Sequence, residues 1–318
     1  MSKIRTILAG SLVSVAALAT ATNAARAEFI NILTGGTSGV YYPLGVALSE
    51  IYAKGIEGSR TQVQATKASV ENLNLLASGK GEVAFALGDS VQSAWAGDTE
   101  AGFKAPLTNL RAIGGIYNNY VQVVAEAAAG VTTITDLKGK SISVGAPASG
   151  TELNARAIFK AAGMSYEDMS KVEYLPFGES AELIKNRQIQ STLSSAGLGA
   201  AFIKDLATTH EITVVAVPAE IVNSIGAPYV ADVIPAGTYK GQDADVPTAA
   251  ITNILVTSEK VSEETVYQMT KLMFENVEAL KSAHSAAAAI DATKAVNSLP
   301  IPLHPGAEKY YREIGVLK

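Results

Sequence analysis

Short apolar runs alternate with amphipathic segments along most of this chain of 318 residues. Residues 29–33 and 83–87 are largely apolar runs, a pattern typical of strands that are covered on both faces of a sheet. Between them, Leu44, Leu48 and Ile51 recur at helical spacing. Because strands and helices alternate, the pattern predicts an α/β fold in which mainly parallel sheets are covered by helices.

The same alternation continues to the end of the chain. Further strands are predicted at residues 61–65, 111–116, 121–125, 141–145, 172–175, 189–193, 212–217 and 251–256. Helices are predicted to open at Ser69, Asp89, Ser149 and Ser180, and at residues 262–281 and 308–314. The polar pair Asn118-Asn119 lies between two strands and suits a crossing between lobes. We therefore assign residues 28–118 to a first lobe, 119–227 to a second lobe, and 228–318 to a return to the first lobe.

A loop of small residues, from Thr34 to Gly39, joins the first strand to the first helix. Its glycines let a ligand approach the backbone closely, and the following helix start presents unpaired N–H groups. A related helix start, Ser149-Gly150-Thr151-Glu152, follows 111 residues later and reads as a capping box. Taken alone, the first loop is interpreted equally well as a ligand-binding loop or as a turn between strand and helix that binds nothing. The repeated plan favours two lobes that enclose a ligand at the strand ends.

Residues 1–27 have the features of a secretory signal peptide. Lys3 and Arg5 precede an apolar core at residues 7–21, and Ala25-Arg26-Ala27 is a small-x-small cleavage pattern. The core is shorter than the ~20 apolar residues of a membrane-spanning helix, although an uncleaved anchor is the alternative. We expect cleavage after Ala27 and a periplasmic protein.

Charge and composition exclude several partners. Loss of the signal peptide takes the basic residues from 25 to 22 against 30 acidic residues, a net charge of −8. This charge disfavours nucleic acid and anionic membranes as partners. The chain has no cysteine, so neither disulfides nor thiolate chemistry is available to it.

Catalytic motifs are weak in this sequence. The three histidines, His210, His284 and His304, fall in segments that we expect at the surface, and none has metal-ligand spacing. No G-x-S-x-G element is present, and Asp89 is interpreted as a helix cap rather than half of an acid–base pair. We therefore predict no enzymatic activity, no cofactor and no metal. An exported enzyme on the same scaffold is the alternative.

Several segments carry a resemblance to a known family. They are residues 34–45 (TGGTSGVYYPLG), 68–73 (ASVENL), 136–140 (DLKGK), 149–152 (SGTE), 234–239 with Gly241-Gln242, and 300–311 (PIPLHPGAEKYY). On these segments the chain resembles the TAXI (TRAP-associated extracytoplasmic immunogenic) solute receptors of tripartite ATP-independent periplasmic transporters. The resemblance implies a type II periplasmic-binding-protein fold, with a hinge and a cleft between two α/β lobes.

The resemblance also implies a function and a site. Such receptors deliver small acids such as glutamate, glutamine or 2-oxoglutarate to an ion-gradient-driven membrane permease, and we expect this one to be monomeric. A receptor that presents its ligand to a membrane sensor kinase would have the same binding chemistry. The implied ligand contacts are Thr37, Ser38, Gly39, Tyr41, Ser69, Asn72, Asp89, Ser90, Ser149, Gly150, Thr151 and Tyr229. Many relatives carry glycine at position 38 and a proline near Gly199, so a ligand contact at residues 194–199 is left open.

Overall fold

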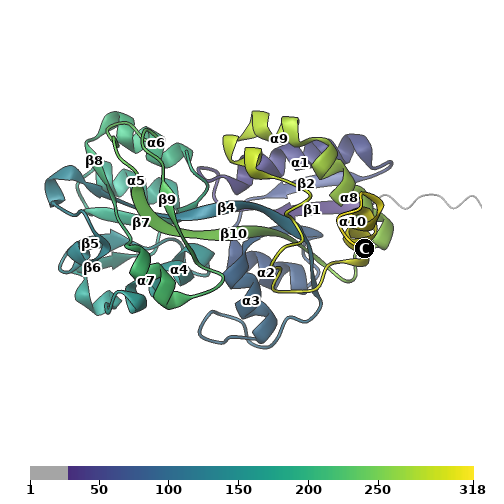
Figure 1. Ribbon diagram of the computed structural model, residues 1–318, viewed down its shortest axis with the longest axis horizontal. Helices are drawn as coiled ribbons and strands as arrows, with labels where there is room; N and C mark the ends of the chain where they lie inside the picture. The colour runs from purple at the N-terminus through teal and green to yellow at the C-terminus, as the bar shows by residue number, and fades with distance from the viewer. Residues whose placement is uncertain (1–27) are drawn as a thin grey trace, which may run out of the picture.

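The computed structural model describes residues 28–318, and the predicted signal peptide lies outside the described residues. The molecule has two lobes side by side, joined by two long strands that run through both (Figure 1). These strands are β4 (Leu110–Glu126) and β10 (Val246–Ser258). The chain passes from one lobe to the other along β4 and returns along β10.

The first lobe carries β1 (Phe29–Leu33), β2 (Arg60–Gln64), β3 (Val83–Leu87), α1 (Tyr41–Gly55), α2 (Ser69–Ala77), α3 (Gly88–Ala96), α8 (Glu263–Glu275), α9 (Val277–Ala283) and α10 (Pro305–Glu313). The second lobe carries β5 (Ser141–Ser143), β6 (Lys171–Glu173), β7 (Ser191–Ala196), β8 (Ile212–Val215), β9 (Val230–Ile234), α4 (Gly150–Ala161), α5 (Phe177–Lys185), α6 (Ala201–Thr209) and α7 (Ala219–Ile225). Short 3₁₀ helices lie at Ala127–Ala129, Ile134–Leu137, Tyr166–Asp168 and Ser285–Ala289. The exact lobe boundaries given above stay a prediction.

The sheets are mixed rather than mainly parallel, which corrects the expectation from the sequence. The strand order is β2-β1-β3-β10-β4-β7-β5-β6, with β8 paired to β4 and β9 to β10. The strands at each end of this order pair in parallel, as expected for strand–helix alternation. β4 and β10 pair antiparallel with each other and with their neighbours, because the chain runs along them in opposite directions.

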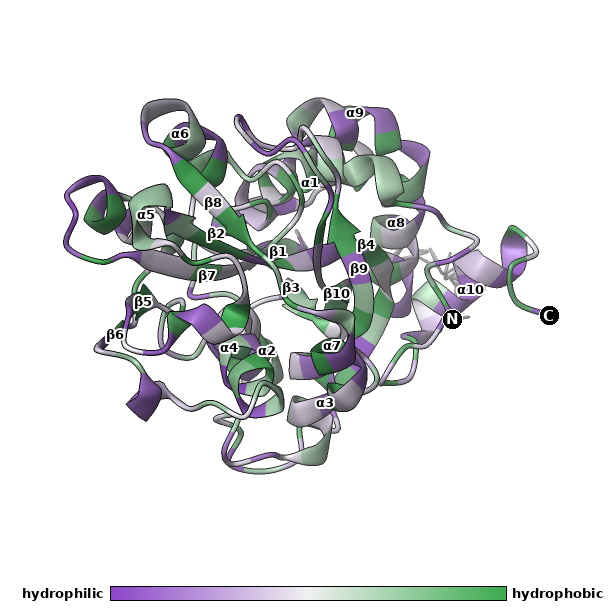
Figure 2. Cartoon of the chain, turned by 60° about the vertical axis from the view of Figure 1, so that its left-hand side comes forward, coloured by the Kyte–Doolittle hydropathy of each residue, from purple (hydrophilic) through white to green (hydrophobic). Residues whose placement is uncertain are grey.

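Apolar strands and the inward faces of the helices form the core. All five residues of β3 are buried, and α1 buries Leu44, Leu48 and Tyr52 against the first-lobe sheet. Tyr41, at the start of α1, stacks on Phe85 of β3 with ring centroids 5.0 Å apart. Figure 2 shows apolar residues along much of β3 and β4, with polar residues on the outer helices. Burial of these side chains stabilises the fold by roughly 25 cal/mol per Å².

The two strands predicted at residues 111–116 and 121–125 are one strand, β4. The prediction separated them at the polar pair Asn118-Asn119, which it interpreted as a crossing between lobes. In the structure, the Asn253 amide on β10 donates hydrogen bonds to Asn119 Oδ1 (2.8 Å) and to the Tyr117 carbonyl (2.9 Å). These bonds satisfy the polar groups, and the strand continues through them.

The helix predicted at residues 262–281 is two helices, α8 and α9, which meet at Asn276. The Asn276 side-chain amide donates to the Leu272 carbonyl at 2.8 Å and so satisfies an end group of α8. Three helix starts were also misplaced. α3 begins at Gly88 and its cap residue is Leu87, so Asp89 is the second residue of the helix rather than its cap. α5 begins at Phe177, so Ser180 is inside the helix rather than its cap, and Ser69 is the first residue of α2 rather than its cap.

Candidate functional site

A cavity of about 110 Å³ lies between the two lobes. Its volume suits a small organic molecule rather than a single water, which needs only about 10–15 Å³. The first lobe and β4 contribute Gly35, Gly36, Gly39, Val40, Tyr41, Thr66, Lys67, Ala68, Ser69, Leu87 and Asn119 to its lining. The second lobe contributes Ala146, Ser149, Gly150, Thr151, Pro176, Phe177, Ser195 and Ala196.

Four helices begin at this cavity, two from each lobe. Their first residues are Tyr41 of α1, Ser69 of α2, Gly150 of α4 and Phe177 of α5, and all four line the cavity. A helix start carries N–H groups without intrahelical partners and a partial positive charge. The cavity is therefore surrounded by groups that favour an anion.

The start of α4 is capped as the sequence predicts, but only by one side chain. The Ser149 hydroxyl accepts a hydrogen bond from the Glu152 N–H at 3.2 Å. The second half of the predicted capping box is wrong, because the Glu152 carboxylate binds Arg156 at 2.6 Å and the Tyr166 hydroxyl at 2.9 Å instead. Ser149, whose hydroxyl caps the helix, and the first helical residue, Gly150, both line the cavity.

The lobes touch on the α2–α4 side of the cavity. A Cβ at Gly150 would lie 2.6 Å from Ser69 Oγ and 2.7 Å from Leu87 Cδ1. The Glu71 N–H of α2 donates to the Ala148 carbonyl of the second lobe at 3.1 Å. Only a residue without a Cβ allows this approach, so the structure is a closed arrangement of the lobes.

A second contact between the lobes lies near α5. A Cβ at Gly39 would come to 3.7 Å from the Phe177 ring, which stacks on Phe202 of α6 with centroids 4.9 Å apart. Ser38 lies on the same side, with its hydroxyl oxygen 3.5 Å from a Cβ built at Gly178. The two contacts between the lobes thus lie at the starts of α4 and α5.

The structure brings half of the predicted contact residues to the cavity. Those that line it are Gly39, Tyr41, Ser69, Ser149, Gly150 and Thr151. Those that do not are Thr37, Ser38, Asn72, Asp89, Ser90 and Tyr229. Ligand contact by any of the twelve stays a prediction.

Asn72 is fully buried and is held by the protein itself. Its amide donates to the carbonyls of Thr34 (2.6 Å) and Phe85 (2.9 Å), and its Oδ1 accepts from the Thr66 hydroxyl (2.6 Å). It thus joins the ends of β1 and β3 to the segment before α2. This bonding gives it a structural role.

Asp89 and Tyr229 form a hydrogen-bond cluster that joins the lobes. Asp89 Oδ2, at the start of α3, accepts from the Asn154 amide of α4 (2.6 Å) and from the Tyr229 hydroxyl (2.7 Å). Asn154 also donates to the Tyr229 hydroxyl at 2.7 Å. Burial raises the pKa of the Asp89 carboxyl, and the hydrogen bonds from Tyr229 and Asn154 only partly oppose this. Neighbouring Ser90 is fully buried.

A chain of hydrogen bonds links this cluster to the cavity. Ser195 Oγ donates to Asn154 Oδ1 at 2.5 Å, the Ser195 N–H donates to the Thr151 hydroxyl at 3.2 Å, and the Asn119 amide donates to the Ser195 carbonyl at 2.9 Å. The Tyr41 hydroxyl donates to Asn253 Oδ1, which extends the chain to β10. Most polar side chains in the lining are therefore already bonded to the protein.

Sequence reasoning missed several lining residues, above all Lys67, Asn119, Phe177 and Ser195. Asn119 was identified only as a crossing residue, and Ser195 lies in the segment whose role was left open. Lys67 is two residues before α2, so its proximity to a predicted helix start was the available signal. Phe177 had no local signal, because its place depends on how the lobes meet.

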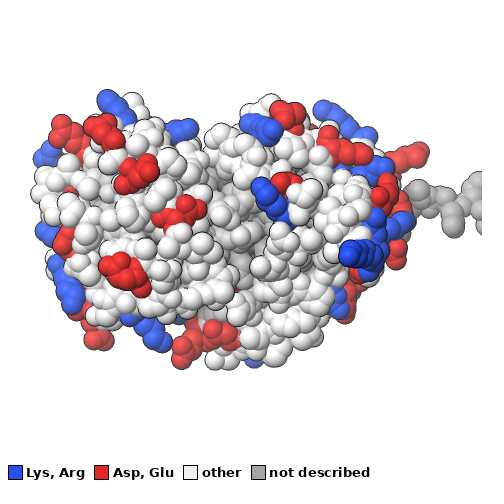
Figure 3. Space-filling view, in the orientation of Figure 1, with Lys and Arg blue, Asp and Glu red and all other residues white. Residues whose placement is uncertain are grey.

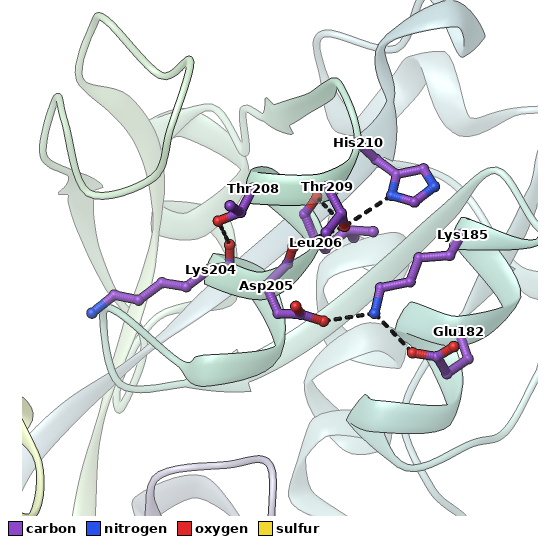
Figure 4. Close-up of polar contacts among 8 residues, drawn as sticks. All are labelled: Glu182, Lys185, Lys204, Asp205, Leu206, Thr208, Thr209 and His210. Carbon is purple, nitrogen blue, oxygen red and sulfur yellow. Dashed lines mark hydrogen bonds and ion pairs between the residues drawn. The ribbon is translucent and has the colours of Figure 1, made fainter.

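A cluster of charged side chains on α5 and α6 lies at the protein surface (Figure 4). Lys185 Nζ lies 2.8 Å from Glu182 and 2.6 Å from Asp205, both exposed acids. Such pairs contribute about 0–1 kcal/mol. One ring nitrogen of His210, in the same view, lies 3.0 Å from the hydroxyl oxygen of the adjacent Thr209.

The expectation that all three histidines lie at the surface is wrong for His304. It is buried and caps α10, accepting from the Gly306 N–H at 3.2 Å. Its other ring nitrogen lies 3.1 Å from the Val261 carbonyl. From residue 28 onward, no group of three or more His, Asp or Glu side chains is placed to hold a metal ion. Within the same span, no helix is long and apolar enough to cross a membrane.

A larger groove of about 970 Å³ lies along β4 and β10. Its lining includes Tyr117, Thr252, and the paired Asp291 and Lys294, whose charged atoms are 3.4 Å apart. None of the predicted contact residues lines this groove. Figure 3 shows that charged side chains gather on the outer faces of the lobes and that the hollow between them is lined mainly by uncharged residues.

The fold is that of periplasmic solute-binding proteins. The chain is similar to the periplasmic binding protein BugD (10% identity, TM-score 0.57), with 91% of this chain and 94% of that chain covered. It is similar to a putative L-cystine ABC transporter protein from Listeria monocytogenes (13% identity, TM-score 0.52, 83% and 98% covered). A third similar structure is the periplasmic aliphatic sulphonate binding protein SsuA from Escherichia coli (11% identity, TM-score 0.50, 91% and 88% covered).

The family follows from the sequence. Residues 32–315 match the NMT1-like family. The chain therefore belongs to the NMT1-like family, and it has the two-lobe α/β fold of periplasmic solute-binding proteins.

Proposed function

We propose that this protein is the periplasmic receptor of a TAXI-type tripartite transporter. It captures a small carboxylate or amino acid, of the glutamate, glutamine or 2-oxoglutarate type, and delivers it to a membrane permease driven by an ion gradient. The resemblance of residues 34–45 and 300–311 to that family supports the transporter type. Export with cleavage after Ala27 is part of the proposal.

The observation that carries the ligand class is the meeting of four helix starts at one cavity. Each start offers unpaired N–H groups, and a carboxylate placed there accepts charge-assisted hydrogen bonds. Two of the starts come from each lobe, so both lobes bind the same ligand. A ligand that contacts both lobes only when they are closed binds the closed form more tightly and shifts the population towards it.

Closure also strengthens the electrostatic attraction. The contacts at Gly150 and Gly39 bring the lobes together around the cavity, and water is excluded there when they close. Coulombic interactions are stronger in such an environment than in water. The closed pair of lobes is then the surface that the permease recognises.

The first experiment screens the mature protein against L-glutamate, L-glutamine, 2-oxoglutarate, pyruvate and short-chain fatty acids, with D-glucose and spermidine as controls without a carboxylate. At 100 times Kd, a ligand stabilises the folded state by about 2.7 kcal/mol. We expect a concentration-dependent rise in Tm and a smaller radius of gyration in X-ray scattering with at least one acid. Binding of glucose or spermidine in place of every acid would contradict the ligand class.

A second experiment tests the transporter type. Proteoliposomes that contain a multi-spanning TAXI-type permease from the same genome should take up the identified acid only when this protein and an ion gradient are present. A requirement for ATP, or uptake without this protein, would contradict the proposal.

A further inference from the structure

The turn that joins β9 to β10, residues 235–245, is fixed by a buried glutamine. The side-chain amide of Gln242 donates to the carbonyls of Ile234 and Pro235, both at 3.0 Å. The backbone N–H of Gln242 donates to the Tyr239 carbonyl at 3.1 Å. The turn lies outside the lining of the cavity. It holds Tyr239 in one place.

The side chain of Tyr239 reaches from this turn to residues 196–199, which lead from β7 towards α6. Its hydroxyl accepts the Gly199 N–H at 3.1 Å. The same hydroxyl donates to Oε1 of Gln122 on β4. Because Tyr239 and Gln122 are both buried, water does not readily replace these bonds.

Gln122 bonds the other end of the same segment. Its side-chain amide donates to the carbonyls of Ala196 at 2.8 Å and Gly197 at 3.3 Å. Together, Gln122 and Tyr239 provide partners for three backbone groups of residues 196–199. A buried backbone group without a partner is unfavourable, so these two side chains stabilise one position of the segment.

Residues 196–199 contribute both to the cavity and to a further contact between the lobes. Ala196 lines the cavity. A Cβ at Gly197 would lie 3.0 Å from the Cβ of Ala286, which follows α9, and 3.3 Å from Cγ2 of Val40 in the first lobe. Val40 also lines the cavity. The position of the segment therefore affects both the shape of the lining and how closely the lobes meet.

From these contacts, and resting on the function proposed above, we infer that Tyr239 is a positioning residue of the binding site. Its hydroxyl, together with Gln122, holds residues 196–199 where they complete the lining and meet the first lobe. Without this hydroxyl, the segment is less ordered before the ligand binds. Binding then has to order it, and the conformational entropy lost in that step lowers the affinity.

The variant Tyr239→Phe tests this inference, because it removes the hydroxyl and keeps the ring. Calorimetric titration uses the acid that binds the wild type most tightly among L-glutamate, L-glutamine, 2-oxoglutarate, pyruvate and short-chain fatty acids. We expect Tyr239→Phe to bind this acid at least tenfold more weakly than the wild type does.

The matched control is Tyr311→Phe. It removes another buried tyrosine hydroxyl, which donates to the Ile113 carbonyl at 3.0 Å and lies outside the lining of the cavity. Both variants should lower the Tm of the protein without ligand, because each leaves a buried group without its partner. Only Tyr239→Phe should lower the affinity, and Tyr311→Phe should stay within about twofold of the wild type.

Hydrogen exchange provides a measurement that needs no ligand. In the protein without ligand, Tyr239→Phe should make the amides of residues 197–200 exchange at least tenfold faster, because the segment opens more often. Tyr311→Phe should leave their exchange unchanged. Equal exchange of these amides in Tyr239→Phe and the wild type would show that Tyr239 does not hold the segment.

A double-mutant cycle tests the connection through Gln122. Gln122→Met removes the donors to the carbonyls of Ala196 and Gly197 and should also weaken binding. Because the two side chains hold the same segment, the double variant should lose less affinity than the product of the two single losses. A loss equal to that product would mean that Tyr239 and Gln122 act independently and would contradict the inference.

The outcomes separate this inference from the proposed function. If the wild type binds an acid and Tyr239→Phe binds it equally tightly, the inference is wrong and the carboxylate receptor stands. If Tyr239→Phe and Tyr311→Phe lose affinity equally, the loss follows stability rather than position, and the inference is again wrong. If none of the acids binds to the wild type, the proposed function is wrong, and so is the inference about its site.

Discussion

Gly150 of α4 and Ser69 of α2 face each other across the two lobes, so closely that a Cβ on Gly150 would lie 2.6 Å from the serine hydroxyl oxygen. The Ser69 hydroxyl cannot easily yield, because it is buried and accepts the Leu87 N–H at 3.1 Å. A methyl group at position 150 therefore keeps the lobes apart. It does so without removing any hydrogen-bonding group from the cavity.

The first prediction follows from this contact. Gly150→Ala should lower the affinity for the carboxylate at least tenfold and abolish the ligand-induced decrease in the radius of gyration. The unliganded Tm should change little, because Gly150 is the first residue of α4 and the preference for alanine over glycine, about 1 kcal/mol, belongs to the interior of a helix. The control is Gly178→Ala in α5, outside the lining of the cavity, where a Cβ comes no nearer than 3.5 Å to another atom. Unchanged affinity and compaction in Gly150→Ala would show that closure at this contact is not needed.

The second prediction concerns the cluster of Asp89, Asn154 and Tyr229. Asp89→Ala removes the acceptor of both hydrogen bonds, and leaving a buried donor without its acceptor costs about 1–3 kcal/mol. We expect a 10- to 100-fold loss of ligand affinity, measured by calorimetry. Asp89→Asn keeps an acceptor oxygen and should stay within about threefold of the wild type.

The control for this pair is Asp243→Ala, which removes an exposed carboxylate and should have no effect. Equal losses in Asp89→Ala and Asp89→Asn would mean that the charge, rather than the two hydrogen bonds, matters for closure.

The third prediction is a pH dependence. Burial in the closed form raises the pKa of Asp89, whereas we expect the carboxyl to keep its usual, lower pKa in an open form that exposes it to water. The closed form therefore takes up a proton between these two pKa values. The closed form is therefore stabilised as the pH falls towards the lower pKa. This stabilisation is lost as the pH rises through the higher pKa. The pKa of Tyr229 is raised well above its usual value by the same burial, so Tyr229 does not titrate in this range.

Calorimetry from pH 8 to pH 5, where a small acid ligand stays ionised, should show tighter binding at the lower pH. Asp89→Asn cannot take up the proton, so its affinity should vary less with pH. If the affinity of the wild type and that of Asp89→Asn change equally with pH, Asp89 is not the origin of the pH dependence.

The fourth prediction separates structural from ligand-binding roles. Asn72→Ala removes the donors that Asn72 provides to the carbonyls of Thr34 and Phe85, although the Thr34 carbonyl keeps its bond from the Thr66 hydroxyl at 2.8 Å. A net hydrogen bond contributes about 0.5–1.5 kcal/mol, and a buried group left unsatisfied costs about 1–3 kcal/mol. We expect the free energy of unfolding to fall by about 2–4 kcal/mol. Ligand affinity at 20 °C should change less than threefold, because Asn72 does not line the cavity. A large loss of affinity without a loss of stability would contradict this account and restore Asn72 as a contact.

Local sequence patterns predicted the elements that position the site. The apolar run at residues 83–87 is β3, and the helical spacing from Leu44 to Ile51 lies in α1. The start of α4 beside Ser149 was also predicted, because a capping serine acts within one turn. Strand–helix alternation was enough for the fold class.

The features of the fold and of the site that the sequence did not predict depend on contacts between distant segments of the chain. Asn119 and Asn253 are 134 positions apart and satisfy each other within β4 and β10, which a local polar pattern cannot reveal. Asp89 was placed at the ligand, but its partners Asn154 and Tyr229 come from α4 and the segment before β9. Phe177 reaches the cavity only because the lobes close over Gly39. Each miss is a tertiary contact that overrides a local interpretation.

A crystal structure of the mature protein with its bound acid tests the central claim most directly. We predict that the carboxylate lies in the cavity between the lobes and accepts hydrogen bonds from backbone N–H groups at the starts of α2 and α4, close to Ser69 and Gly150. A ligand in the groove along β4 and β10, or a carboxylate turned away from the helix starts, would contradict the account.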